Sequence, residues 1–156
     1  MTKQQLIADV RNAWKSELSK EVEDSLVAYT PHPEEVEARE LFRGLQWTEV
    51  PDETLELNFP NLLLLGSTAL RYYLPAFITC VLRKNGWSEL QERLVDGLFR
   101  VPKKEAPLQL FRAKFDPLTY SQKRAVADFL RYIAERYDLD SRFRKRVTDS
   151  ITRYWG

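Results

Sequence analysis

The chain has 156 residues, 44% of them hydrophobic, and its 24 Lys and Arg residues nearly balance its 23 Asp and Glu residues. This length and composition predict one globular domain spanning residues 1–156, and they exclude a disordered chain. Cys80 is the only cysteine, which excludes an internal disulfide. A secretory signal has a cationic segment followed by an apolar run, and we find no such pattern in the sequence. We therefore expect a cytoplasmic protein.

The N-terminal segment predicts a helix that begins after Thr2. Apolar residues recur at helical spacing from Leu6 to Leu18, and Thr2 with Gln5 fits the capping-box pattern. A second helix is expected to begin at Pro33. Proline suits the first helical position, and four glutamates follow it within seven residues, where acidic side chains favour a helix N-terminus.

The only histidine, His32, precedes that proline. One histidine with no cysteine pair cannot make a zinc site, and no serine or cysteine nucleophile motif accompanies it. The four glutamates after it could hold a hard metal ion, but we interpret them as a solvated helix face. The sequence also has no glycine-rich phosphate loop. We therefore predict no catalytic residue, no metal site and no cofactor.

The most apolar stretch, LLLLGSTALRYYLPAFITCVL, spans residues 62–82. Its charge, Arg71, and its proline, Pro75, argue against a membrane span. Gly66 and Ser67 predict a break followed by a helix N-cap. We expect a central helix over about residues 68–84 that Pro75 kinks or restarts, because proline lacks the N–H that the helix needs. The rest of the molecule should pack around this helix.

The remaining pattern is also helical. Capping boxes are predicted at Ser88 and at Thr119, and glycines at 44, 86 and 97 are placed to end helices in the left-handed conformation. The fold class is therefore all-α, a single-domain bundle of six or seven helices. The longest non-helical stretches are expected at residues 19–30, 45–65 and 99–115.

One set of motifs resembles a known family. The chain contains Trp47, then Arg71-Tyr72-Tyr73-Leu74-Pro75-Ala76-Phe77, and later Leu118-Thr119-x-x-Gln122. In this order the residues resemble a family of uncharacterised bacterial proteins, a domain of unknown function with the pattern W, R-[YF]-x-L-P-A-[FY] and L-[ST]-x-x-Q. The resemblance implies a shared fold, and it brings no activity with it.

Arg71 is the most informative polar residue, because a buried arginine needs partners. It is expected to pair with a carboxylate or with the carbonyls of the preceding loop. Alternatively, its planar fork faces a cleft and binds an anion. The candidate binding residues are thus Arg71, Tyr72, Tyr73 and Trp47, where the aromatic groups are expected to meet the arginine.

Charge is distributed unevenly along the chain. Residues 1–78 hold 7 Lys or Arg and 13 Asp or Glu, whereas residues 79–156 hold 17 and 10. The basic side chains that form a candidate patch on the last two helices are Arg131, Arg142, Arg144, Lys145 and Arg146. Such a patch is a feature of nucleic-acid-binding proteins, although the sequence pI of about 7.8 is low for that class.

These features leave three interpretations of function. We favour a non-enzymatic protein-interaction module, either an adaptor or an immunity-type inhibitor, which binds a protein partner and no membrane. The first alternative is a nucleic-acid-binding helical protein that uses the basic C-terminal helices. The second is an enzyme or small-anion binder at Arg71 and Tyr73. The bipolar charge suits the first interpretation, because it can steer a charged partner.

Overall fold

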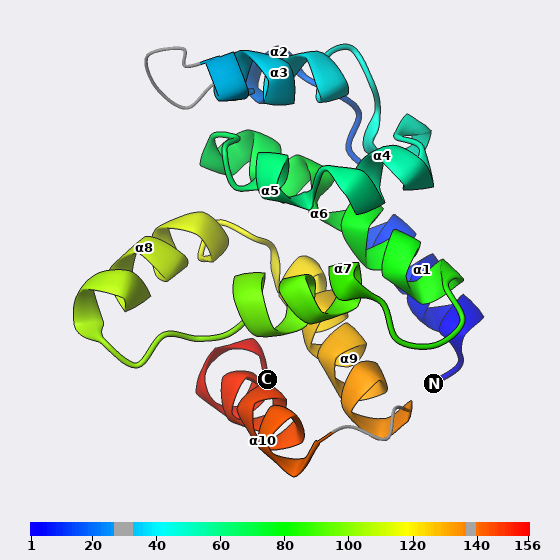
Figure 1. The fold of residues 1–156 in the computed structure, drawn as a ribbon, viewed down its shortest axis with the longest axis vertical. Helices are drawn as coiled ribbons and strands as arrows, with labels where there is room; N and C mark the ends of the chain where they lie inside the picture. Colours follow the sequence, from blue (N-terminus) through cyan, green and yellow to red (C-terminus); the bar gives the residue numbers. More distant parts are fainter. Residues whose placement is uncertain (27–32, 137–139) are drawn as a thin grey trace.

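One apolar helix, α6 (Ser67–Arg83), runs through the middle of the molecule (Figure 1). The structure is a computed structural model that describes residues 1–26, 33–136 and 140–156. In this helix every residue from Ala69 to Leu82 except Arg71 is buried. The helix continues through Pro75 without a restart. The all-α bundle around a central apolar helix is therefore confirmed. Within the described ranges no helix is both long and apolar enough to cross a membrane.

Three helices from the first third of the chain pack above and beside α6. They are α1 (Lys3–Ala13), α2 (Lys20–Asp24) and α3 (Pro33–Phe42). The capping box at Thr2 is confirmed, because its hydroxyl accepts from the Gln5 N–H and the Gln5 side chain accepts from the Thr2 N–H. His32 lies outside the described residues, and so do residues 27–31.

The structure is divided into more helical segments than six or seven. Short helices occupy the stretches expected to be non-helical: α2 lies within residues 19–30, and residues 45–65 form η1 (Trp47–Glu49), α4 (Asp52–Leu57) and α5 (Phe59–Leu62). Residues 99–115 include a longer helix, α8 (Glu105–Phe115). Its Pro107 lies in the first turn, where the missing N–H leaves no hydrogen bond broken.

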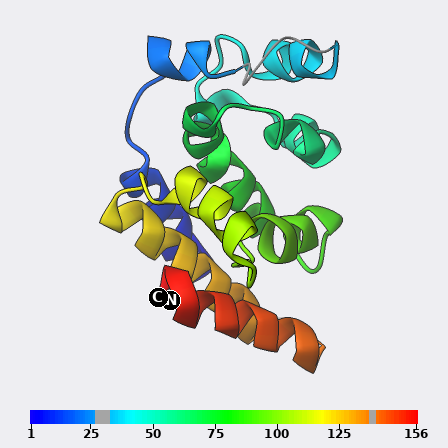
Figure 2. The same ribbon diagram turned by 90° about the vertical axis from the view of Figure 1, so that its left-hand side faces the viewer.

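The second half of the chain forms the lower part of the molecule (Figure 2). Its remaining elements are α7 (Glu89–Glu92), η2 (Arg93–Leu98), α9 (Tyr120–Arg136), α10 (Ser141–Ser150) and η3 (Ile151–Trp155). Both η2 and η3 are π-helical turns that continue α7 and α10. An aromatic cluster joins these elements to α8, with the Trp155 ring 5.4 Å from Phe99 and 5.1 Å from Phe115.

The N-terminus of α6 takes its cap from a distant segment. Gly66, not Ser67, is the N-cap residue, and it has no side chain to accept a hydrogen bond. Instead the hydroxyl of Ser25 accepts from the Ala69 N–H at 3.0 Å, and the Ser25 carbonyl accepts from the Gly66 N–H at 2.8 Å. The end of α2 is thereby fixed to the start of α6. The predicted break was correct, but the capping residue was wrong.

Two of the three predicted helix-ending glycines adopt the left-handed conformation. Gly44 has φ 73° and Gly86 has φ 91°, values that other residues rarely adopt. Gly97 does not end a helix, since it lies inside η2. The two exposed turns at 44 and 86 therefore depend on glycine, whereas position 97 does not.

The second predicted capping box is only half formed. The Ser88 hydroxyl accepts from the Gln91 N–H at 3.1 Å, but the Gln91 side chain turns inward and is 1% exposed. Neither its amide nitrogen nor its amide oxygen has a hydrogen-bond partner among the described residues. A buried amide without partners loses its hydration without compensation, which costs about 1–3 kcal/mol.

Replacing Gln91 with methionine should therefore stabilise the protein. Methionine has a similar shape and no amide to desolvate, so we expect the free energy of unfolding to rise by about 1–2 kcal/mol. Denaturant unfolding of the variant measures this change. The control is the same substitution at Gln109, which is exposed on α8 and should have little effect. A loss of stability in Gln91→Met would show that the amide is satisfied in the folded protein.

Candidate functional site

The four residues singled out from the sequence do lie together. Arg71, Tyr72 and Tyr73 are consecutive on α6, and Trp47 begins η1, which packs against that helix. The backbone N–H of Trp47 donates to the Tyr72 hydroxyl at 3.4 Å, and this hydroxyl donates to the side-chain oxygen of Gln46 at 3.1 Å. Trp47, Tyr72 and Tyr73 are buried, and Arg71 is partly buried.

A fifth residue, Trp14, completes this cluster. Pro75 has no N–H to donate to the carbonyl of Arg71, four residues earlier in α6. The indole N–H of Trp14 donates to that carbonyl at 2.9 Å. The carbonyl of Trp14, at the end of α1, in turn accepts the indole N–H of Trp47 at 3.0 Å. Two tryptophans thus satisfy carbonyls that the helices leave unpaired.

The other two polar groups of the cluster also bind helix ends. The Tyr73 hydroxyl lies 2.9 Å from the carbonyl of Phe42 and 2.7 Å from that of Leu45, where α3 ends. The Arg71 guanidinium donates to the carbonyl of Lys114 in the last turn of α8 at 2.8 Å. Its second nitrogen contacts the Thr68 hydroxyl at 3.4 Å. A cation at a helix C-terminus is favourable, because the free carbonyls there carry partial negative charge.

Burial shifts the ionisation of these side chains. It raises the pKa of Tyr73 well above its ordinary value and lowers the pKa of Arg71, because in both cases it penalises the charged form. Tyr73 therefore stays protonated, and Arg71 still carries its charge at neutral pH. Arg71 donates to a backbone carbonyl, as one expectation had it, but this carbonyl belongs to α8 rather than to the preceding loop. The geometry favours a role in joining helices.

Two of the basic residues predicted as a patch are paired with carboxylates, and four of the five line hollows beside α10. Arg131 pairs with Asp128 at 3.0 Å, and Arg146 holds Asp96 with two contacts of 2.8 and 3.3 Å. Arg142, Lys145 and Arg146 line one groove beside α10, together with Arg100 and Lys103 from the segment before α8. Arg144 lines a neighbouring hollow on the same helix, and Lys145 lines both hollows. Three of the predicted basic residues therefore share this groove with Arg100 and Lys103, which the prediction did not include.

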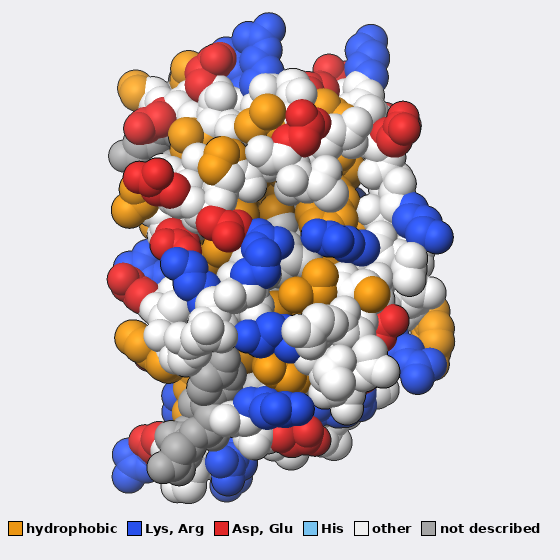
Figure 3. All heavy atoms as spheres, turned by 90° about the vertical axis from the view of Figure 1, so that its right-hand side faces the viewer, with side chains coloured by type: hydrophobic (Ala, Val, Ile, Leu, Met, Phe, Trp, Pro, Cys, Tyr) orange, Lys and Arg blue, Asp and Glu red, His pale blue; other side chains and the backbone are white. Residues whose placement is uncertain are grey.

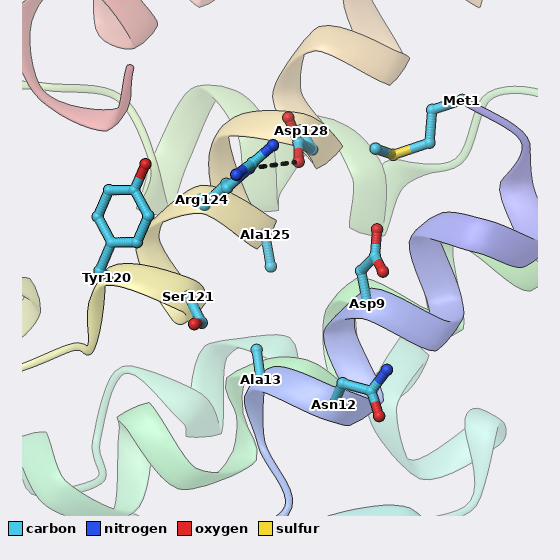
Figure 4. Close-up of a pocket in the computed structure, with 9 residues that line it drawn as sticks. All are labelled: Met1, Asp9, Asn12, Ala13, Tyr120, Ser121, Arg124, Ala125 and Asp128. Carbon is cyan, nitrogen blue, oxygen red and sulfur yellow. Dashed lines mark ion pairs between the residues drawn. The ribbon is translucent and has the colours of Figure 1, made fainter.

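A groove with a mixed polar and apolar lining lies between α1 and α9 (Figure 4). Its volume is about 370 Å³. Asp9 and Asn12 face it from α1, and Arg124 and Asp128 face it from α9, paired at 3.9 Å. The lining offers hydrogen-bond donors and acceptors but places no nucleophile beside a base. On the side of the molecule away from α8, Lys and Arg side chains alternate with Asp and Glu (Figure 3).

An apolar groove lies between α5 and α8. Its volume is about 390 Å³. Phe59, Phe111 and Phe115 contribute buried rings to its lining. Two leucines of the lining are open to solvent, Leu63 with an exposed fraction of 50% and Leu110 with 68%. Nothing in the sequence singled out this groove, because its lining comes from three separate segments, within residues 59–63, 97–102 and 107–115.

No metal site is found in the parts of the chain that the structure describes, where three or more His, Cys, Asp or Glu side chains nowhere form a group that could hold an ion. Cys80 lies on α6, fully buried, and burial raises the pKa of its thiol to about 12. Its thiol is therefore neutral at physiological pH, as an inert core cysteine should be.

A comparison against protein families shows which family the chain belongs to. The model of a family of unknown function (DUF6714) matches residues 3–156, and the chain belongs to this family. The resemblance seen in the tryptophan and arginine-proline motifs is thereby confirmed at the level of the family. Searches of the curated proteins and of the solved structures gave no match.

Proposed function

We propose that this chain is a non-enzymatic protein-binding module, an adaptor or an immunity-type inhibitor, that holds an amphipathic helix of a protein partner in the α5–α8 groove. The observation that carries this proposal is the pair of exposed leucines, Leu63 and Leu110, in one apolar groove. Single exposed leucines are common on protein surfaces, but a floor of phenylalanines with leucine walls is the form of a helix-binding groove. The proposed location remains the cytoplasm.

The groove is firmly held in place. Arg71 fixes the C-terminal end of α8 through the Lys114 carbonyl. The ring of Phe111 packs 4.9 Å from that of Phe115 and 5.8 Å from that of Trp155, so the inner face of α8 is part of the aromatic cluster. A rigid groove loses little conformational entropy when a partner binds, which favours affinity.

The charge beside the groove defines the partner further. Residues 99–115, which form one wall and its approach, carry five Lys or Arg and a single carboxylate, Glu105. Two of these cations, Arg100 and Lys114, line the groove itself. Charge complementarity therefore favours a partner helix whose apolar face is flanked by aspartate or glutamate.

The test uses a synthetic amphipathic peptide of about 18 residues with leucines at helical positions i, i+3, i+4 and i+7 and glutamates beside them. A second peptide carries lysines in place of the glutamates. Fluorescence anisotropy should show saturable binding of the acidic peptide and at least roughly tenfold weaker binding of the basic one, a difference of about 1.4 kcal/mol.

The groove variant is Leu110→Glu, which removes an apolar wall and adds a charge that repels the acidic peptide. We expect it to weaken binding at least roughly tenfold. The matched control is Leu57→Glu, because Leu57 is 73% exposed at the end of α4 and lies outside the groove. Equal losses in the two variants, or equal binding of the two peptides, would contradict the proposal. Thermal unfolding confirms that both variants are folded.

A further inference from the structure

The basic groove described above lies between residues 100–103 and α10, and we call it the α10 groove. Its volume is about 270 Å³. Five cationic side chains line it, and Asp149 is the single carboxylate among the lining residues. The cations come from two parts of the chain: Arg100, Lys103, Arg142, Lys145 and Arg146. Like charges that gather around one hollow repel one another, so the folded protein gains stability when an anion enters it.

The groove is built on a well-fixed frame. The Val101 N–H donates to the buried Ser150 hydroxyl at 3.0 Å. Arg153 donates to the carbonyls of Val101 and Pro102 at 3.1 and 2.9 Å, and the Trp155 indole donates to the carbonyl of Phe99 at 2.9 Å. These four hydrogen bonds dock the backbone of residues 99–102 against α10 and η3. The position of Lys103 relative to α10 is set by this docking.

The carboxylates near the groove are already engaged. Asp96 is held by Arg146 in a two-contact pair and lies 3.8 Å from Arg100. Asp149 pairs with Arg153 at 3.6 Å. Among the residues that the structure describes, no carboxylate pairs with the side chains of Lys103, Arg142 or Lys145. These three cations are the groups that remain for a ligand.

We propose that the α10 groove binds a small phosphate-bearing anion, a phosphate monoester or a diphosphate. Arginine offers a planar fork that matches two phosphate oxygens, and lysine offers a mobile point charge, so Arg142 with Lys103 and Lys145 suits a compact polyanion. The small volume favours such a ligand over an extended polymer. This site uses different residues from the helix-binding groove, apart from Arg100 at the boundary, and does not depend on that proposal.

The experiment measures binding of inorganic pyrophosphate by the full chain. We expect a saturable rise in the melting temperature, since a ligand that binds only the folded state stabilises it. Sodium chloride at equal ionic strength should not reproduce this rise. Amide resonances of residues 99–104 and 141–150 should shift during the titration. The double variant Arg142→Gln/Lys145→Gln should bind at least roughly tenfold more weakly.

The matched control is Arg112→Gln, which neutralises an exposed cation on α8 outside this groove and should leave the affinity for pyrophosphate unchanged. An equal loss of affinity in the control, or full reproduction by chloride, would overturn the proposal. A single-stranded oligothymidine is the second probe. If it binds more tightly than pyrophosphate and Arg112→Gln and Arg131→Gln weaken it too, the surface is a nucleic-acid interface and the small-anion site is rejected.

Discussion

Replacing Trp47 with alanine is expected to lower the free energy of unfolding by about 3–5 kcal/mol. The Trp47 side chain is 6% exposed, so its removal leaves a large cavity between η1 and α6. The substitution also removes the indole N–H from the carbonyl of Trp14, which ends α1. A buried carbonyl without a donor adds to the cost. Denaturant unfolding followed by circular dichroism measures the change.

The chain provides a matched control at Trp87. This tryptophan is 60% exposed in the turn after α6, and Trp87→Ala should change the free energy of unfolding by less than about 1 kcal/mol. If Trp47→Ala lowered the free energy of unfolding no more than Trp87→Ala, Trp47 would not be needed for stability. That result would favour a role in ligand binding. A large loss in Trp47→Ala alone supports helix joining as the function of the cluster.

Gly66→Ala is expected to be the second severe substitution, lowering the free energy of unfolding by about 2–4 kcal/mol. A β-carbon at position 66 would lie 2.6 Å from the Ser25 carbonyl oxygen and would overlap the Ser25 hydroxyl. Both atoms accept hydrogen bonds from the start of α6, so the clash displaces the cap as well as the backbone. The backbone of Gly66 itself has φ −60°, so the penalty comes from contact and not from conformation.

Two companion variants separate these contributions. Ser25→Ala removes only the capping hydroxyl and should cost about 1 kcal/mol. Gly97→Ala makes the same substitution where nothing lies within 4 Å of the new β-carbon, and it should be neutral or stabilise by up to about 1 kcal/mol. A result in which Gly66→Ala and Gly97→Ala behave alike would show that α2 and α6 are not in close contact at this point.

The central helix could be predicted from the sequence because its apolar character is unlike any other segment. The run from Leu70 to Leu82 is buried on nearly all sides, and such a run has only one place in a bundle of this size. Helix α8 falls within a stretch predicted to be non-helical, because only two of its residues, Phe111 and Phe115, are buried and its apolar pattern is weak. A helix that is buried at nearly every position is clear from the sequence, whereas a helix with two buried residues is not.

The position of the candidate cluster could be predicted, but its chemistry could not. The predicted central helix places Arg71, Tyr72 and Tyr73 together, and the structure confirms the expectation that they meet Trp47. Which carbonyls accept their hydrogen bonds depends on where α3 and α8 end, and this is set by tertiary packing. One signal was available: a proline inside a helix leaves the carbonyl four residues before it unpaired, which calls for an outside donor such as Trp14.

The contact between Trp14 and the Arg71 carbonyl makes position 14 depend on Pro75, which lies 61 residues later in the sequence. A descendant that exchanged this proline for alanine would return a donor to α6 and leave the indole N–H without its acceptor. Phenylalanine would then suffice at position 14, whereas it would not beside the proline. Among homologous chains, tryptophan at the first position and proline at the second should therefore be inherited or lost together.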